Sequence, residues 1–137
     1  FNWRLNSEQI CKYLPHKFDI WWNPDKFNWE DDSKSLCLEI PDKFEQWWDP
    51  NKFNWEDSST FLCSELSSKF EIWWPFMKSR ITSNTYASLV QHCGNYFHKW
   101  FDPEKIPWNE IPLTDWEKGC SKFENIWKPY YIMKRLE

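Results

Sequence analysis

Two histidines and two cysteines are the residues best suited to metal binding or nucleophilic chemistry in this sequence. His92, Cys93 and His98 lie close together in the chain, and Cys120 lies further on. Zinc sites usually show tighter paired spacings, and a catalytic Cys–His pair is indicated even less. The sequence also lacks the glycine-rich phosphate loops, the nucleophile elbow and the HExxH motif. We therefore expect no enzyme activity, no metal and no cofactor.

Two acidic clusters, Glu30-Asp31-Asp32 and Glu56-Asp57, are a second candidate for metal binding. Calcium loops space their ligands around a central glycine, and these clusters do not. Carboxylates in the first turn of a helix instead meet free backbone N–H groups and the positive end of the helix dipole. We interpret both clusters as helix starts.

Adjacent tryptophans are the third candidate, because exposed indole rings can stack on sugars or on single-stranded nucleic acid. Neighbouring residues on a helix point about 100° apart, so both rings of a pair cannot face one neighbour equally. Their helical spacing with phenylalanine favours a role in the core: we expect one ring to pack within the repeat and the other between repeats, or one ring to be partly exposed. The candidate binding surface consists of the second tryptophans and the recurring lysines beside them: Trp22, Trp48, Trp74, Lys17, Lys43 and Lys69.

The composition narrows the function classes. The chain has 137 residues, 13 of them Trp and only 2 of them Gly, and its net charge is −4. That charge gives no basic field for nucleic acid or for an anionic membrane. No stretch approaches the roughly 20 apolar residues of a membrane span. Scarce glycine disfavours hairpin-rich barrels and suits helices.

The elements that would position these residues form a tandem repeat. Its anchor is a phenylalanine at positions 18, 44, 70, 97 and 123, with spacings of 26, 26, 27 and 26 residues. We predict one repeat array over residues 1–137, with repeats at 17–42, 43–68, 69–95 and 96–121 and partial repeats at 1–16 and 122–137. Phe1-Asn2-Trp3 repeats Phe27-Asn28-Trp29, so we expect the sequence to begin inside a repeat, as a fragment or a processed product.

The sequence pattern of each repeat predicts two short helices. The first begins after a capping asparagine, Asn28 or Asn54, and buries one face of apolar residues at helical spacing. The second runs from about Pro41 to Trp48, with the proline at its first position. A helix of two turns is marginal alone, so each repeat must stack on the next.

Cys11, Cys37 and Cys63 recur once per repeat. Helices pack roughly 8–10 Å apart, beyond the Cα separation of about 7 Å that a disulfide tolerates. We interpret these cysteines as small buried apolar residues of a protein in a reducing, intracellular compartment.

The pattern weakens over residues 75–96 and 106–121. The turn at 75–83 is replaced, and Asp115, Gly119 and Pro112 occupy positions where a regular helix is expected. Atypical units cap repeat arrays or host a specialised contact, and both interpretations stay open.

The unit KFxxWWxPxKFNWEDS, at residues 17–33 and 43–58, resembles Trp-rich tandem repeats in uncharacterised proteins of giant DNA viruses. This resemblance implies a viral repeat protein located in the host cytoplasm or the virion, and a structural component of the particle. It supplies no binding or catalytic residues.

Together these observations predict an all-α fold, an α-solenoid of roughly 26-residue repeats, each a pair of short helices. The expected function is a non-enzymatic scaffold for protein–protein interaction, including end-to-end self-association, without a nucleic-acid partner. The alternative is a ligand-binding module that stacks its tryptophans on glycan or single-stranded nucleic acid.

Overall fold

The computed structural model describes residues 1–137. Its helices begin directly after the capping asparagines, as the sequence predicts. Asn28 and Asn54 precede α3 (Trp29–Glu39) and α5 (Trp55–Glu65), and each Oδ1 accepts a first-turn backbone N–H at 3.2 Å. α1 (Trp3–Tyr13) starts in the same way after Asn2. All regular elements are helical, so the predicted all-α fold class is confirmed.

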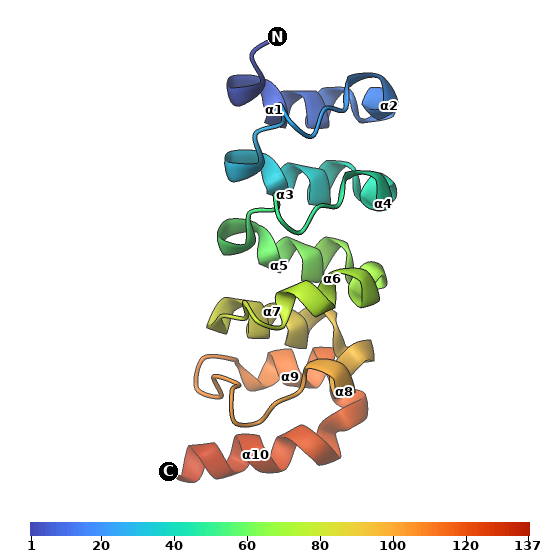
Figure 1. The fold of residues 1–137 in the computed structure, drawn as a ribbon. Coiled ribbons are helices and arrows are strands. Elements are labelled where there is room, and N and C mark those ends of the chain that lie inside the picture. Colours follow the sequence, from blue (N-terminus) through green and yellow to red (C-terminus); the bar gives the residue numbers. More distant parts are fainter. The chain divides into compact units, whose positions relative to one another are not determined.

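The chain divides into two compact units, Phe1–Leu66 and Ser67–Glu137. Unit 1 contains α1, the 3-10 turn η1 (Pro15–Lys17), α2 (Phe18–Trp21), α3, η2 (Pro41–Lys43), α4 (Phe44–Trp47) and α5. Within this unit α3 packs against both α1 and α5, and the three helices stack one after another (Figure 1). Stacking of equivalent helices is the arrangement that the repeat predicted.

The apolar face predicted for the first helix of each repeat is buried. Counted by helix pairs, the first repeat of unit 1 is residues 1–26, the second is 27–52, and the third begins at residue 53. Leu36, Cys37 and Ile40 of the second repeat are 0% exposed, and Leu62 and Cys63 of the third repeat are also 0% exposed. Burial of such side chains is the main stabilising contribution to the stack, worth roughly 1.5–3 kcal/mol for each large apolar residue.

The second helix of the repeat differs from the prediction, because it is not one helix from Pro41 to Trp48. Pro41 begins a 3-10 turn, α4 follows as a single α-helical turn, and Trp48 has left the helix with φ −61° and ψ 125°. The chain must leave here because the next turn starts at Asp49, whose Oδ1 accepts the backbone N–H of Asn51 at 2.9 Å.

Unit 2 contains η3 (Ser67–Lys69), α6 (Phe70–Met77), α7 (Ser83–His92), η4 (Gly94–Tyr96), α8 (Phe97–Trp100), α9 (Leu113–Gly119), η5 (Ser121–Phe123) and α10 (Glu124–Leu136). Here α6 runs on through Pro75, whereas α2 and α4 end at the first tryptophan of their pairs. Pro112 does not interrupt a helix, because it is the residue from which α9 starts.

Gly119 lies where two helices of unit 2 approach closely. A Cβ atom added at Gly119 would lie 1.8 Å from the carbonyl oxygen of Val90 on α7, and one at Gly94 would lie 1.9 Å from the carbonyl oxygen of Gly119. No side chain fits at either place. The glycine at an expected apolar position is therefore explained by the contact between α7 and α9.

Stacked tryptophans fill the core of unit 2. The Trp116 ring lies 5.1 Å from the Trp108 ring and 5.2 Å from the Trp127 ring, nearly parallel to both. Trp127 Nε1 donates a hydrogen bond to the carbonyl of Cys120 at 2.8 Å, whereas the buried Trp116 Nε1 has no partner. These stacked rings pack in the core of unit 2 together with aliphatic residues such as Leu89 and Ile111.

Two further findings concern the whole chain. Cys11, Cys37 and Cys63 are buried, as predicted, and Cys93 and Cys120 are buried as well; no disulfide joins the five. No helix combines the length and the apolar character that a membrane crossing requires.

Candidate functional site

The junction between repeats in unit 1 is built on a buried serine that the sequence analysis did not single out. Ser33 Oγ donates to the carbonyl of Trp29 and accepts the backbone N–H of Asn54, in the next repeat, at 3.1 Å. Ser7 Oγ accepts the backbone N–H of Asn28 in the same way, at 3.0 Å. A period-26 serine four residues after the tryptophan was the signal available in the sequence.

The capping asparagine also joins neighbouring repeats. Asn28 Nδ2 donates to the carbonyl of Arg4 at 2.9 Å and to the carboxylate of Asp31 at 3.0 Å. Asn54 Nδ2 donates to the carbonyl of Glu30 at 2.5 Å. One asparagine therefore caps its own helix with Oδ1 and binds the previous helix with Nδ2. These bonds lie at the surface of the stack and favour one register of neighbouring helices, each contributing about 0.5–1.5 kcal/mol.

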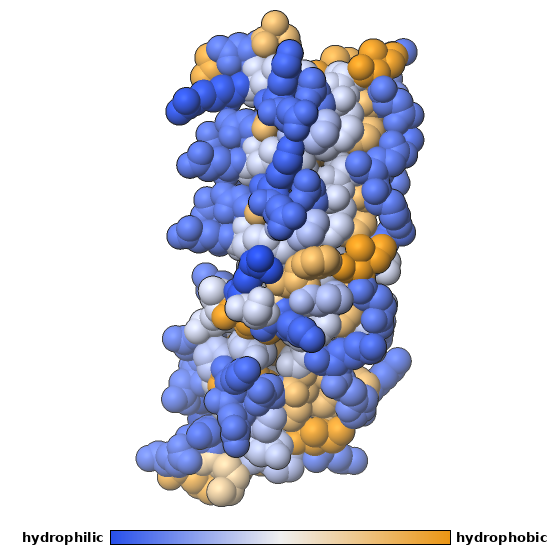
Figure 2. Space-filling view, in the orientation of Figure 1, coloured by the Kyte–Doolittle hydropathy of each residue, from blue (hydrophilic) through white to orange (hydrophobic).

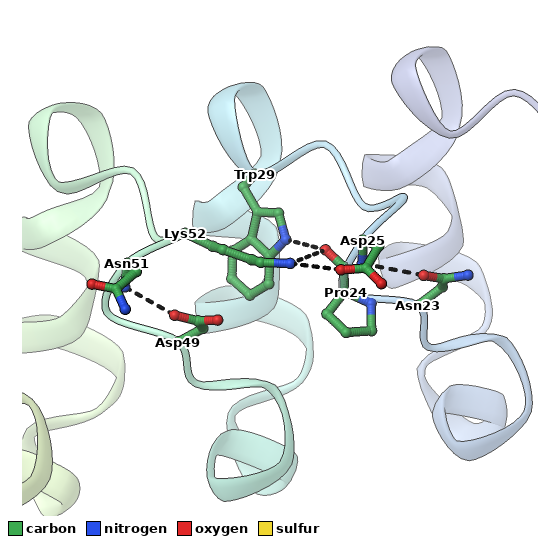
Figure 3. Close-up of polar contacts among 7 residues, drawn as sticks. All are labelled: Asn23, Pro24, Asp25, Trp29, Asp49, Asn51 and Lys52. Atoms are coloured by element: carbon green, nitrogen blue, oxygen red, sulfur yellow. Dashed lines mark hydrogen bonds and ion pairs between the residues drawn. The ribbon is translucent and has the colours of Figure 1, made fainter.

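Lys52, to which the sequence pattern assigns no role, links the two repeats at the surface of the same junction (Figure 3). Its Nζ lies 2.9 Å from Asp25 Oδ1 and 3.4 Å from the carbonyl oxygen of Pro24, in the preceding repeat. The Pro24 carbonyl also accepts the indole N–H of Trp29 at 2.7 Å. A partly exposed ion pair of this kind contributes at most about 1 kcal/mol to the stability of the fold. We therefore interpret Lys52 as a residue that aligns the two turns.

The first tryptophan of each pair in unit 1, and the single tryptophans Trp100 and Trp127 of unit 2, hold the end of the preceding first helix. Each Nε1 donates to the carbonyl of the residue seven positions earlier, which caps the C-terminus of that helix. These bonds are Trp21 to Leu14, Trp47 to Ile40, Trp100 to Cys93 and Trp127 to Cys120. The first tryptophan is thus a structural residue that satisfies a carbonyl left open at a helix end.

The second tryptophan of each pair is half-buried and has one ring face covered within its own repeat. Trp22 stacks on Phe18 at 5.1 Å, Trp48 on Phe44 at 5.2 Å, and Trp74 of unit 2 on Phe70 at 5.2 Å. Trp22 and Trp48 also meet the next Phe of the chain at a tilt and the next Trp edge-on. The ring face that stacks on phenylalanine is therefore closed to a planar ligand.

The candidate lysines have different environments. Lys43 is half-buried and lies 3.6 Å from Asp19 of the preceding repeat, whereas Lys17 is exposed. Lys69 is half-buried and belongs to unit 2. That these three lysines and the three tryptophans bind a partner stays a prediction.

The first repeat of unit 1 exposes apolar side chains that the second repeat buries or replaces. Phe1 and Leu14 are 75% and 42% exposed, whereas their equivalents Phe27 and Ile40 are 4% and 0% exposed. Three more apolar side chains, Leu5, Tyr13 and Ile20, stand where the second repeat has Asp31, Glu39 and Gln46. We call these five residues, Phe1, Leu5, Tyr13, Leu14 and Ile20, the first-repeat face; apolar surface is visible at that end of unit 1 (Figure 2).

The buried thiols are poor nucleophiles. Burial, with smaller contributions from Asp32 and Glu39, raises the pKa of Cys11 to about 12. Burial and the neighbouring Cys93 raise the pKa of Cys120 to about 12 as well. These thiols stay protonated at neutral pH, and the thiolate is the reactive form. No group of three or more His, Cys, Asp or Glu side chains is placed to hold a metal ion.

Comparisons with protein-family models, with curated proteins and with solved structures find no match to this chain. The interpretation of the site therefore rests on its own geometry.

Proposed function

We propose that this chain is a non-enzymatic repeat scaffold, which assembles by protein–protein contact between its first-repeat face and a helical repeat of a second copy. The observation that carries the proposal is the exposure of Leu5, Tyr13 and Ile20, at positions where the second repeat has Asp31, Glu39 and Gln46. Apolar side chains are thus exposed in the first repeat at positions that are polar in the second.

The interface between repeats inside unit 1 indicates what would cover the first-repeat face. Phe27 is packed by Trp22 of the preceding repeat, with ring centroids 5.4 Å apart. We expect a tryptophan of a second copy to pack against the first-repeat face in the way that Trp22 packs against Phe27. Exposed apolar patches of this kind commonly mark interaction surfaces.

The setting of this scaffold extends the proposal. Protonated, buried cysteines suit a reducing, intracellular compartment. The resemblance to Trp-rich repeats of giant DNA viruses suggests the host cytoplasm or the virion, with the chain as a structural part of the particle. The stacking alternative, with glycan or single-stranded nucleic acid as the ligand, has less support because Phe18 and Phe44 cover one face of the second tryptophans.

A variant based on the repeat itself tests the proposal. The triple substitution Leu5→Asp, Tyr13→Glu and Ile20→Gln installs the residues that the second repeat has at these positions, so the fold should be retained. Leu38→Lys is the matched control, because it replaces an exposed leucine of α3 by the residue of the first repeat. The readout is light scattering coupled to size-exclusion chromatography, with circular dichroism to confirm folding.

We expect the unmodified chain and the Leu38→Lys control to associate as concentration rises. The triple variant should remain monomeric. A chain that stays monomeric at every concentration, or a triple variant that associates as well as the control, would refute the first-repeat face as a self-association surface.

A further inference from the structure

A cleft in unit 2 lies where the repeat pattern breaks, between the end of α6 and the start of α7. It has a volume of about 520 Å³, and its polar lining consists of Lys78, Ser79, Thr82, Ser83, Tyr86 and Lys105. A neighbouring hollow of about 400 Å³ shares the two lysines and Tyr86 and adds aromatic walls from Trp74 and Phe101. The replaced turn at residues 75–83 creates this space.

The charge of the cleft is positive. Two lysines and no carboxylate line it. Lys78 makes no ion pair, and Lys105 Nζ lies 4.0 Å from Asp102, at the limit of an ion pair. Asp102 and Lys99 line the neighbouring hollow, where Lys99 pairs with Glu71 at 3.3 Å. An anion in the cleft would therefore meet an uncompensated ammonium group at Lys78.

Helix α7 adds a second source of positive potential. It is ten residues long, and Thr82 caps it by accepting the backbone N–H of Thr85. The backbone N–H groups of Ser83 and Asn84, in the first turn, have no acceptor within the protein. Such N–H groups and the helix dipole favour an anion at this end.

Tyr86 is the independent observation that points to a ligand. The side chain is only 5% exposed, lines both the cleft and the hollow, and makes no hydrogen bond with the protein. The Tyr86 hydroxyl is not one of the fully buried polar atoms, so it is open to a ligand that enters the cleft. Burial and the nearby charge of Asp102 raise its pKa, so the hydroxyl remains a hydrogen-bond donor at neutral pH.

We propose that this cleft binds a phosphate group, with Lys78 and Lys105 as the cationic contacts and the Tyr86 hydroxyl as a neutral donor. Phosphate offers several acceptor oxygens and up to two negative charges, which suits a mixed set of ammonium, hydroxyl and backbone N–H donors. The site needs no glycine-rich loop, which is why the motif search did not reveal it. This inference goes beyond the scaffold function and does not depend on it.

Calorimetric titration with inorganic phosphate tests the site on the full chain. Lys78→Gln should weaken phosphate binding about tenfold or more, since it removes a charged hydrogen bond. Tyr86→Phe removes one oxygen and should weaken binding by about three- to tenfold. The matched control is Lys26→Gln, at the equivalent repeat position but in a hollow lined by Glu30 and Asp31, and it should leave binding unchanged. Circular dichroism checks that each variant is folded.

A second titration with phenyl phosphate distinguishes the source of the group. Tighter binding of phenyl phosphate would assign the aromatic hollow to the organic part of a phosphate monoester, and equal binding would assign the cleft to free phosphate. No saturable binding of either probe, or equal binding by Lys78→Gln, Tyr86→Phe and the unmodified chain, would overturn the proposal.

Discussion

Replacing Ser33 by alanine should destabilise unit 1 through a single hydrogen bond between repeats. Ser33 is fully buried, and its Oγ accepts the backbone N–H of Asn54 at 3.1 Å. Alanine retains the helix and most of the volume, but it leaves this N–H without an acceptor at the junction.

The expected loss of stability follows from a comparison of two serines in α3, Ser33 and Ser35. An unsatisfied buried donor costs about 1–3 kcal/mol, and the better helix propensity of alanine over serine returns about 0.5 kcal/mol. Ser35, two residues further along α3, is also buried and makes no hydrogen bond, so Ser35→Ala gains the same propensity without the loss. The two variants should therefore differ by about 1–3 kcal/mol in the free energy of unfolding.

Urea unfolding followed by circular dichroism measures this difference, with the unmodified chain in parallel. A Ser33→Ala variant within about 0.5 kcal/mol of Ser35→Ala would refute the role of the serine in joining repeats.

Three further predictions concern other parts of the chain. Gly119→Ala should destabilise unit 2 by about 1–3 kcal/mol or more in urea unfolding, because its Cβ would clash with the Val90 carbonyl. Trp127→Phe should be more destabilising than Trp116→Phe, by about 1–3 kcal/mol in the same assay, because only the Trp127 indole N–H has an acceptor. Burial and neighbouring carboxylates raise the pKa of Asp32 above 3.8, so the folded state binds its proton more tightly than the unfolded state. Asp32→Asn should therefore raise stability at pH 7, measured by urea unfolding across pH, and the gain should vanish as the pH falls towards 3.8.

Much of the fold could be predicted because the repeat displays its own constraints. Asn28 and Asn54 recur before a first turn rich in carboxylates, which identifies two helix starts, and both are confirmed. Leu36 and Cys37 recur on one helical face and are buried. The stack of short helices follows, because none of them is stable alone.

The junction could not be predicted with the same ease, because its residues have ordinary types. Ser33 looks like any polar helix residue until the next repeat supplies the N–H that it accepts. Lys52 forms its ion pair with Asp25 only when two turns lie side by side. Trp48 was expected inside a helix, and the backbone leaves the helix there because the following turn requires it. Contacts between residues 21 and 27 positions apart decided the outcomes for Ser33 and Lys52, and no local pattern encodes them.

The cleft of unit 2 shows a different limit. The replaced turn at residues 75–83 was visible in the sequence, but its consequence was not. The position of the Tyr86 side chain in the cleft, with Lys78, depends on how α6 and α7 meet. A break in a repeat therefore indicates where to look and says little about what is found there.

The central claim is that buried serine–asparagine junctions hold the repeats of unit 1 in register, and amide hydrogen exchange measured by NMR tests it most directly. The backbone amides of Asn28 and Asn54 precede their helices and have no helical hydrogen bond. They should nevertheless exchange as slowly as the buried helical amides of α3, because exchange requires the repeats to separate. Exchange of both amides at the rate of unprotected turn amides would contradict the account.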